Sequence, residues 1–274
     1  MKNKITLLIV IFASLFFNSC EDVVDIPLDT DEPRLVIDAS INWFKGTSGN
    51  DQVIKLSTTT DYYSNEIPPV LGATVFIANS AGTIFNFIET PNTGEYVCSD
   101  FVPVLNETYT LTVINNGQTY TATETLKPVA SITSVEQEMQ EHFGTEALEI
   151  KAFFEDPADA ENFYLYKYKF TDSPTPDYSV AEDQFFQGNT FFSVVYQEDT
   201  NPGDQVEIMH YGISETYYNY MRILLSVAGS MSGGPFQSPP ATVRGNITNL
   251  TDFDNYALGY FRLSEADVTN YTIE

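Results

Sequence analysis

Short runs of alternating apolar and polar side chains, separated by turn residues, constrain this chain of 274 residues more than any other feature. Residues 73–78 and 83–88 are two such runs, and a turn sequence of Asn, Ser, Ala and Gly lies between them. Residues 109–113 and 119–123 flank Asn116-Gly117, a pair that accepts the positive φ angles of a tight hairpin. Because side chains alternate between the two faces of a strand, these runs predict strands rather than helices.

Residues 34–128 therefore predict a β-sandwich of the immunoglobulin type, whose first strand begins in the run 35–41. Lys127-Pro128 interrupts the pattern, and we place a domain boundary there. Residues 129–274 contain further strand-like runs between loops rich in Asp, Pro and Gly, which predicts a second, β-rich domain. The main runs of that domain are 148–154, 163–170, 190–196, 205–211, 243–248 and 256–263.

One segment of the second domain has helical spacing. Residues 214–229 begin with Ser214, a residue type that caps helix N-termini, and end at Gly229, a residue type common just past a helix. The spacing predicts an amphipathic helix that packs on a sheet. The predicted fold class is thus all-β: an N-terminal immunoglobulin-like β-sandwich followed by a β-rich domain with one amphipathic helix. The apolar positions of the helix are Tyr217, Met221, Leu224, Leu225 and Ala228.

The first twenty residues have the organisation of an export signal. Lys2 and Lys4 precede an uncharged apolar run, residues 5–17, which is shorter than the roughly 20 residues of a membrane-spanning helix. Cys20 follows a serine, and lipoprotein signal peptidase requires a small residue before the cysteine. We expect residues 1–19 to be a signal peptide and Cys20 to carry covalent lipid, such as palmitate. Ordinary secretion with an incidental cysteine is the alternative.

Residues 20–33 are acidic and contain two prolines, Pro27 and Pro33, so we expect an extended acidic tether. Glu21 and Asp22 directly follow the cysteine, which resembles the surface-export signal of Bacteroidota lipoproteins. The resemblance implies a lipid-anchored protein on the outer face of the outer membrane. A lipoprotein that faces the periplasm, with a tether that is only solvated, is the alternative.

The charge of the chain excludes two classes of partner. It has 38 acidic and 12 basic residues, for a net charge of −26. Removal of Lys2 and Lys4 with the signal peptide leaves 10 basic residues and a net charge near −28. Nucleic acids and anionic headgroups both bind basic patches, so we expect no nucleic-acid partner and a membrane association through the lipid anchor only.

Catalytic motifs are missing from the sequence. His142 and His210 are the only histidines, and neither has the spacing of a zinc site. The sequence has no Gly-x-Ser-x-Gly elbow and no phosphate-binding glycine loop. Cys98 has no partner for a disulfide and is predicted to be a small buried hydrophobe. We predict a protein that is not an enzyme and needs no cofactor beyond the lipid.

Calcium is a weaker hypothesis for two acidic loops. Asp156, Asp159 and Glu161 lie within one loop, and Asp252 and Asp254 lie within another. Several carboxylate oxygens within a short loop suit a hard cation, although neither loop has the spacing of an EF-hand. The alternative is that both loops are only solvated.

Adjacent aromatic residues form the most suggestive candidate for a binding surface. In a strand, the two members of such a pair face opposite sides, so one is exposed unless a second layer covers it. Exposed aromatic rings bind sugars, peptides or proteins. We single out Tyr62 and Tyr63 as candidate contacts, while burial of both members is the alternative. The other pairs are Phe185-Phe186, Phe191-Phe192 and Tyr217-Tyr218.

Three motifs of the second half, together with the run 35–41, resemble the Bacteroidota lipoproteins collected as domain of unknown function 4249. The motifs are Ser-Gly-Gly-Pro-Phe-Gln-Ser-Pro (232–239), Arg-Gly-Asn-Ile (244–247) and Ala-Leu-Gly-Tyr-Phe (257–261). Their glycines predict close backbone approach or positive φ. The loop around Phe236 could instead be presented to a partner.

The resemblance implies a role in uptake, because members of that family are encoded beside TonB-dependent receptors. It implies no catalytic residues. Our leading hypothesis is a non-catalytic surface lipoprotein that acts as an accessory or substrate-capture partner of a TonB-dependent transporter. A cell-surface adhesin or structural component of another outer-membrane complex is the alternative. A glycan or peptide hydrolase, which would need a pair of carboxylates, is the third hypothesis.

Overall fold

The computed structural model describes residues 32–61, 64, 66–228 and 243–274. Within these ranges, no helix is both long enough and apolar enough to cross a membrane. We call residues Pro33–Glu274, which form one compact unit, the body. The first half of the body contains eight strands. They are β1 (Leu35–Phe44), β2 (Gln52–Thr58), β3 (Thr74–Asn79), β4 (Ile84–Glu89), β5 (Glu95–Cys98), β6 (Thr108–Asn115), β7 (Gln118–Thr125) and the late two-residue strand β14 (Thr248–Asn249).

The second half contains the longest strands and the helix. Its strands are β8 (Ile132–His142), β9 (Thr145–Glu155), β10 (Phe163–Phe170), β11 (Asp177–Glu182), β12 (Thr190–Gln197), β13 (Gln205–Ile213) and β15 (Leu258–Thr272). Helix α2 spans Glu215–Val227, and a short 3₁₀ helix, η1, spans Asp183–Phe185.

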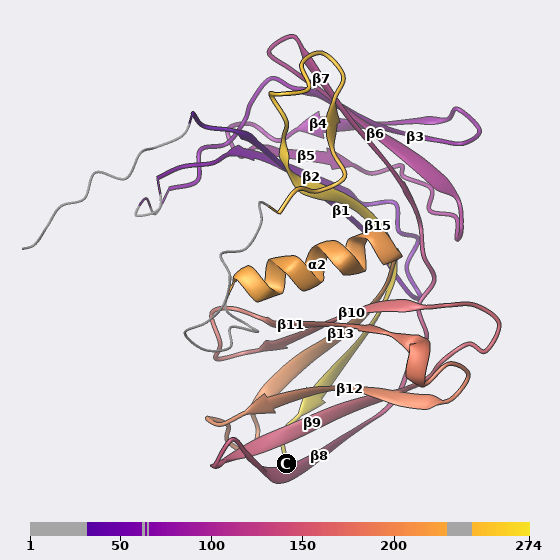
Figure 1. The fold of residues 1–274 in the computed structure, drawn as a ribbon, viewed down its shortest axis with the longest axis vertical. Coiled ribbons are helices and arrows are strands. Elements are labelled where there is room, and N and C mark those ends of the chain that lie inside the picture. The colour runs from indigo at the N-terminus through magenta and orange to yellow at the C-terminus, as the bar shows by residue number, and fades with distance from the viewer. Residues whose placement is uncertain (1–31, 62–63, 65, 229–242) are drawn as a thin grey trace, which may run out of the picture. The chain divides into compact units, whose positions relative to one another are not determined.

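The first half is a β-sandwich whose two layers are joined through strand β4 (Figure 1). One layer has β1, β2, β5 and β4, the other has β3, β6, β7 and β14, and β4 pairs with both β5 and β3. Alternate side chains of each strand, such as Ile37, Ile77 and Leu111, point inward and form one buried core. The predicted immunoglobulin-like sandwich is confirmed.

The second half encloses its own core between two sheets. Strands β10 and β13 supply Tyr166, Tyr168 and Ile208, and the three-stranded sheet of β12, β9 and β8 supplies Ile150 and Phe154. The side chains on the opposite face of β10 and β13 contact α2 in a third cluster. The prediction of a β-rich second half with one amphipathic helix is confirmed.

Helix α2 begins and ends close to the predicted bounds. The Ser214 hydroxyl caps its N-terminus by accepting a hydrogen bond from the Tyr217 amide at 3.2 Å. Tyr217, Met221 and Leu225 face the sheet, as the spacing predicts, whereas Ala228, predicted for the same apolar face, is exposed. The helix ends at Val227, because Ala228 already serves as its C-cap.

Strand β15 belongs to both halves of the body. Residues Val36–Phe44 of β1 pair in parallel with Leu258–Ala266. The remaining part of β15, from Ala266 to Thr272, pairs antiparallel with β13. The twelve-stranded sheet is therefore continuous from one half into the other through this strand.

The chain leaves the first core between Leu126 and Val129, where we placed the domain boundary. It returns, however, because Ile247, Phe261 and Leu263 are buried in that same first core. The two cores are thus not contiguous in sequence, and residues 129–274 serve both.

The Arg-Gly-Asn-Ile motif (244–247) fixes this return to the first core. Arg244 lies 3.8 Å above the Tyr256 ring, and the Asn246 side chain forms two 2.9 Å hydrogen bonds with the backbone of Phe261. The predicted strand 243–248 is wrong except at its last residue, because the Asn246 amide supplies the pairing that a backbone ladder would make.

Two motif glycines allow the backbones to approach closely, as predicted. A Cβ atom on Gly245 would lie 1.7 Å from the carbonyl oxygen of Gly259. A Cβ on Gly259, whose φ is +93°, would lie 2.1 Å from the carbonyl oxygen of Ile37 on β1. Both glycines are therefore required at the start of the pairing between β15 and β1.

We predict that Gly259→Ala lowers the free energy of unfolding by about 3 kcal/mol, because the added methyl group meets a backbone oxygen at positive φ. Gly117→Ala is the matched control, since Gly117 has φ of +75° but nothing within 4 Å of its Cβ position. It should cost about 1 kcal/mol. Urea unfolding measures both; equal losses would contradict the proposed close contact.

Candidate functional site

A serine and a histidine approach each other as a nucleophile and a base would. The Ser193 hydroxyl of β12 lies 2.7 Å from Nε2 of His210 on β13. The Tyr168 hydroxyl also bonds to Ser193. Among the described residues, Nδ1 of His210 has no hydrogen-bond partner, so no carboxylate orients the ring. A catalytic triad would place an acid at that nitrogen.

The burial of this pair excludes a substrate from it. His210 is 0% exposed and Ser193 is 2% exposed, and both lie inside the second core. Burial lowers the pKa of His210 to about 3, so its ring is neutral at ordinary pH. We interpret the pair as an internal polar network that positions β12 against β13.

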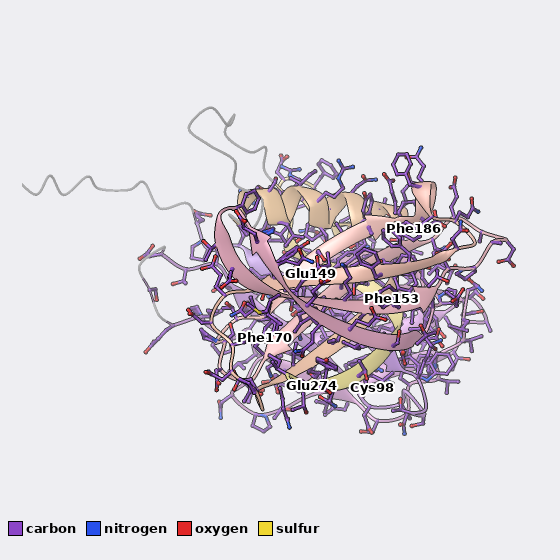
Figure 2. All side chains as sticks on the ribbon, turned by 90° about the horizontal axis from the view of Figure 1, so that it is seen from below. Cys98, Glu149, Phe153, Phe170, Phe186 and Glu274 are labelled. Atoms are coloured by element: carbon purple, nitrogen blue, oxygen red, sulfur yellow. The ribbon has the colours of Figure 1, made fainter. Side chains whose placement is uncertain are left out.

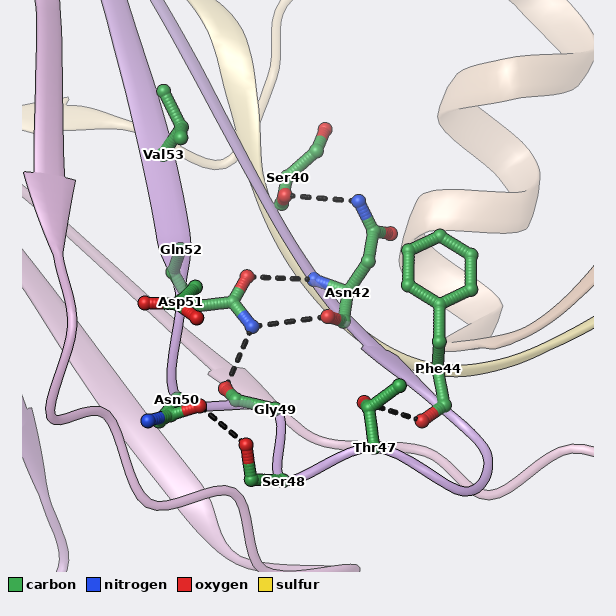
Figure 3. A pocket seen from close by; sticks show the side chains of 10 residues that line it. All are labelled: Ser40, Asn42, Phe44, Thr47, Ser48, Gly49, Asn50, Asp51, Gln52 and Val53. Atoms are coloured by element: carbon green, nitrogen blue, oxygen red, sulfur yellow. Dashed lines mark hydrogen bonds between the residues drawn. The ribbon is translucent and has the colours of Figure 1, made fainter.

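A cleft of about 420 Å³ opens where β1 and β2 separate (Figure 3). The buried Gln52 side chain replaces the missing strand ladder there. Its Oε1 accepts a hydrogen bond from the backbone N–H of Asn42 at 3.1 Å. Its Nε2 donates to the backbone carbonyls of Asn42 and Gly49 at 2.9 and 2.8 Å. The side chains of Ser40, Asn42 and Phe44 line the cleft on the side that faces α2.

A buried arginine lies behind the cleft. Arg262 of β15 is opposite Ser40 in the register, and its Nη2 donates to Oδ1 of Asn42 at 2.9 Å. Its guanidinium lies 5.0 Å from the Tyr211 ring and 5.4 Å from the Tyr217 ring. Among the described residues, its Nε and Nη1 find no hydrogen-bond partner and no carboxylate forms an ion pair with it.

The arginine places a buried positive charge behind Asn42 in an otherwise acidic protein. Aromatic faces and an amide oxygen compensate a buried cation less than a carboxylate does. Asp51 places a carboxylate in the lining of the same cleft, so charges of both signs border it. The arrangement suits binding rather than proton transfer, because Ser40 and Asn42 contribute a hydroxyl and an amide to this wall of the cleft.

The predicted calcium ligands do not converge. Asp156 is buried, and its two oxygens accept from the Tyr164 hydroxyl at 2.5 Å and the Gly188 amide at 2.9 Å. Burial raises its pKa. Asp159 and Glu161 are exposed. Within the ranges that the structure covers, no three His, Cys, Asp or Glu side chains are placed to hold a metal ion.

The second acidic loop belongs to the first half of the body. Asp252 and Asp254 are both exposed, and Oδ1 of Asp252 accepts from the backbone amide of Asp254 at 3.1 Å. This contact is a local turn, and the loop lies against β7 rather than near Asp156.

Several candidate residues fall outside the described part of the chain. These are Cys20, Glu21, Asp22, Tyr62, Tyr63 and Phe236. Cys98 is described: it is a buried free thiol, as predicted, and burial raises its pKa to about 11.

The aromatic pairs divide between core and surface. Phe186 stacks on Phe191 with ring centroids 3.8 Å apart, while its neighbour Phe185 is 90% exposed. Tyr217 and Tyr218 belong to the first turn of α2, and both are buried. Figure 2 shows Phe186, together with Phe153 and Glu149 of β9, from the side of the three-stranded sheet.

The sequence did not predict the buried position of Arg262 or the contact between Ser193 and His210. A signal for the arginine was present, because Tyr-Phe-Arg-Leu-Ser (260–264) places one cation in an apolar strand. The serine and histidine are 17 residues apart and carry no motif.

We predict that His210 makes the protein less stable in acid. The unfolded chain accepts a proton near pH 6.5 and the folded ring resists it until about pH 3, so stability is lost as pH falls from 6.5 towards 3. His210→Gln should reduce the loss between pH 7 and 5 by about 2 kcal/mol. Urea unfolding at both pH values measures this. His142→Gln, outside the core, is the control and should retain the wild-type loss because His210 is intact; an unchanged pH dependence in His210→Gln would contradict the assignment.

Solved structures that align with parts of the chain do so at low identity and low TM-scores. A two-domain fibronectin type III segment of chicken tenascin aligns with 66% of this chain and 91% of its own length, at 12% identity and a TM-score of 0.21. The FN1–FN3 domains of chicken CNTN1 align with 67% of this chain and 62% of theirs, at 14% identity and a TM-score of 0.27. At such low TM-scores the similarity implies nothing about what the chain does.

No curated protein sequence matches the chain. A family model does match, over residues 21–269, and it is described as "Domain of unknown function (DUF4249)". The match covers nearly all of the chain after Cys20, and it includes the motifs 244–247 and 257–261 that join β15 to the first core. The chain therefore belongs to the DUF4249 family.

Proposed function

We propose that this chain is a non-catalytic lipoprotein on the outer face of the outer membrane, where it serves a TonB-dependent transporter as an accessory or substrate-capture partner. The sequence Ser19-Cys20-Glu21-Asp22 carries the proposal, because it combines a lipoprotein cleavage site with a surface-export signal. The family match begins at residue 21, which agrees with a mature chain that starts at Cys20.

We propose a transporter as the partner because of the motifs that this chain shares with the family it resembles. Bacteroidota lipoproteins with motifs like 244–247 and 257–261 are encoded beside TonB-dependent receptors. These two motifs join β15 to the first core, so the resemblance extends to residues that define this fold.

The accessible features of the body favour binding over catalysis. The serine–histidine pair is sealed in the second core, whereas the cleft beside Asn42 is open to solvent. Phe143, at the tip of the β8–β9 hairpin, is 98% exposed. Exposed rings of this kind form contacts with protein partners.

We predict that tagged protein purified from detergent-solubilised outer membrane carries palmitate and copurifies with a β-barrel transporter identified by mass spectrometry. Cys20→Ser should lose both the palmitate and the barrel. Cys98→Ser is the matched control and should retain both, because that thiol is buried.

Two results would overturn the proposal in different ways. Wild-type protein that carries no palmitate would contradict the proposed lipid anchor. Acylated wild-type protein that copurifies with a surface matrix or another complex, and with no barrel, would instead favour an adhesin or structural component.

A further inference from the structure

The chain enters the body at one end of the sandwich, beside an exposed loop. Pro33 and Leu35 line a shallow hollow together with Leu71 and Asn255. The Arg34 guanidinium donates to the carbonyl of Asp254 at 3.4 Å and lies 4.2 Å from the Tyr256 ring. The start of the body is thus held directly against the loop that connects β14 to β15.

Five apolar side chains project into solvent around this entry point. Phe253 is 72% exposed, Ile67 is 71% exposed and Leu250 is 66% exposed. Leu71 and Ile114 are also exposed. We call this set, Ile67, Leu71, Ile114, Leu250 and Phe253, the tether-end rim.

Backbone contacts hold the members of the rim at the same end of the sandwich. The Leu250 amide donates to the carbonyl of Thr119, the residue opposite Ile114 in the β6–β7 hairpin. Pro69, between Ile67 and Leu71, bridges to Ser57 next to the start of β1. An exposed apolar set around one point marks a contact surface.

The tether limits how far this end lies from the lipid. Pro33 comes thirteen positions after Cys20. An extended chain spans at most about 3.3–3.6 Å per residue, so the rim stays within roughly 45 Å of the acylated cysteine. Within that limit the rim stays at an effective concentration of the order of millimolar near the membrane.

We propose that the tether-end rim docks on the lipid bilayer that holds the anchor, with Phe253 and Leu250 entering the interface between headgroups and acyl chains. The inference rests on the acylation of Cys20 and is independent of the transporter. Docking at this end gives the body a fixed orientation, with its entry point towards the lipid.

The charges around the rim specify the kind of lipid surface. Asp252 and Asp254 flank Phe253, and two cations, Arg34 and Arg244, lie over the ring of the nearby Tyr256. The local charges therefore balance, while the protein as a whole is strongly acidic and anionic headgroups would repel it. The apolar side chains supply the attraction, and a neutral, zwitterionic surface is the favoured one. At millimolar effective concentration even a weak contact keeps the rim docked.

The anchor can be reproduced chemically for a test. Mature protein with unacylated Cys20 is coupled to a maleimide lipid in phosphatidylcholine vesicles. Cys98 does not compete, because it is buried and its raised pKa leaves little thiolate. Tryptophan emission is then compared between vesicles with and without brominated acyl chains, which quench rings that reach the interface.

The chain carries its own reference fluorophore. Trp43, the single tryptophan, lies eight residues along β1 from Leu35, roughly 25 Å from the rim at the rise of a strand. Phe253→Trp adds a probe at the rim. Phe185→Trp adds a probe in η1 of the second half as the matched control, at a position that is even more exposed, 90% against 72% for Phe253.

We expect bromolipid to quench the added Phe253→Trp emission about twofold, since an interfacial side chain lies about 5–10 Å into the headgroup boundary. Trp43 and the Phe185→Trp probe should stay unquenched. Leu250→Ser in the Phe253→Trp protein should reduce the quenching.

Three outcomes would overturn the inference: no quenching of Phe253→Trp on coupled vesicles, equal quenching of the Phe185→Trp probe, or quenching that appears only with anionic lipid. Because the anchor is made in vitro, these outcomes are independent of acylation in the cell and of any barrel partner. Failure of the proposed function is therefore distinguishable from failure of the docking surface.

Discussion

Strand β15 pairs in parallel with β1 over Leu258–Ala266 and then antiparallel with β13, and both halves of the body depend on this double pairing. A parallel pair requires a long connection, so the strand that completes the first sandwich arrives only after the whole second half. Side chains of β15 also form hydrogen bonds with the segment that leads from β7 into β8. Glu265 and Asp267 accept hydrogen bonds from the amides of Val129 and Ile132 at 2.9 and 2.7 Å.

The alternation of β15 distributes its residues among the clusters that define the fold. Phe261 and Leu263 enter the sandwich core, and Tyr260 and Ala266 face α2. Arg262 lies on the α2 side of the same strand, and this places a buried cation behind the cleft beside Asn42. The register between β1 and β15 places Arg262 opposite Ser40, and this determines where the buried cation lies relative to the cleft.

Local features of this fold could be predicted from the sequence, and long-range pairings could not. The β6–β7 hairpin has positive φ at Asn116 and Gly117, as Asn-Gly requires, and α2 ends within two residues of its predicted bounds. Strand β8 was missed because most of its side chains are exposed and its alternation is weak. The return of residues 247–263 to the first core was also missed, since nothing local to β15 specifies a partner more than 200 residues earlier. Arg262 therefore acquires its neighbours only through tertiary structure.

Native-state hydrogen exchange of the mature protein in increasing urea tests the double pairing most directly. If β15 couples the two cores, amides of β1, β13 and β15 should exchange through one common opening whose free energy equals that of global unfolding. Amides in the interior of the first sandwich, such as those of β6, should follow the same urea dependence. Complete exchange of β13 and β10 at a urea concentration where β1 and β6 remain protected would contradict the coupling, because it would mean that each half opens alone.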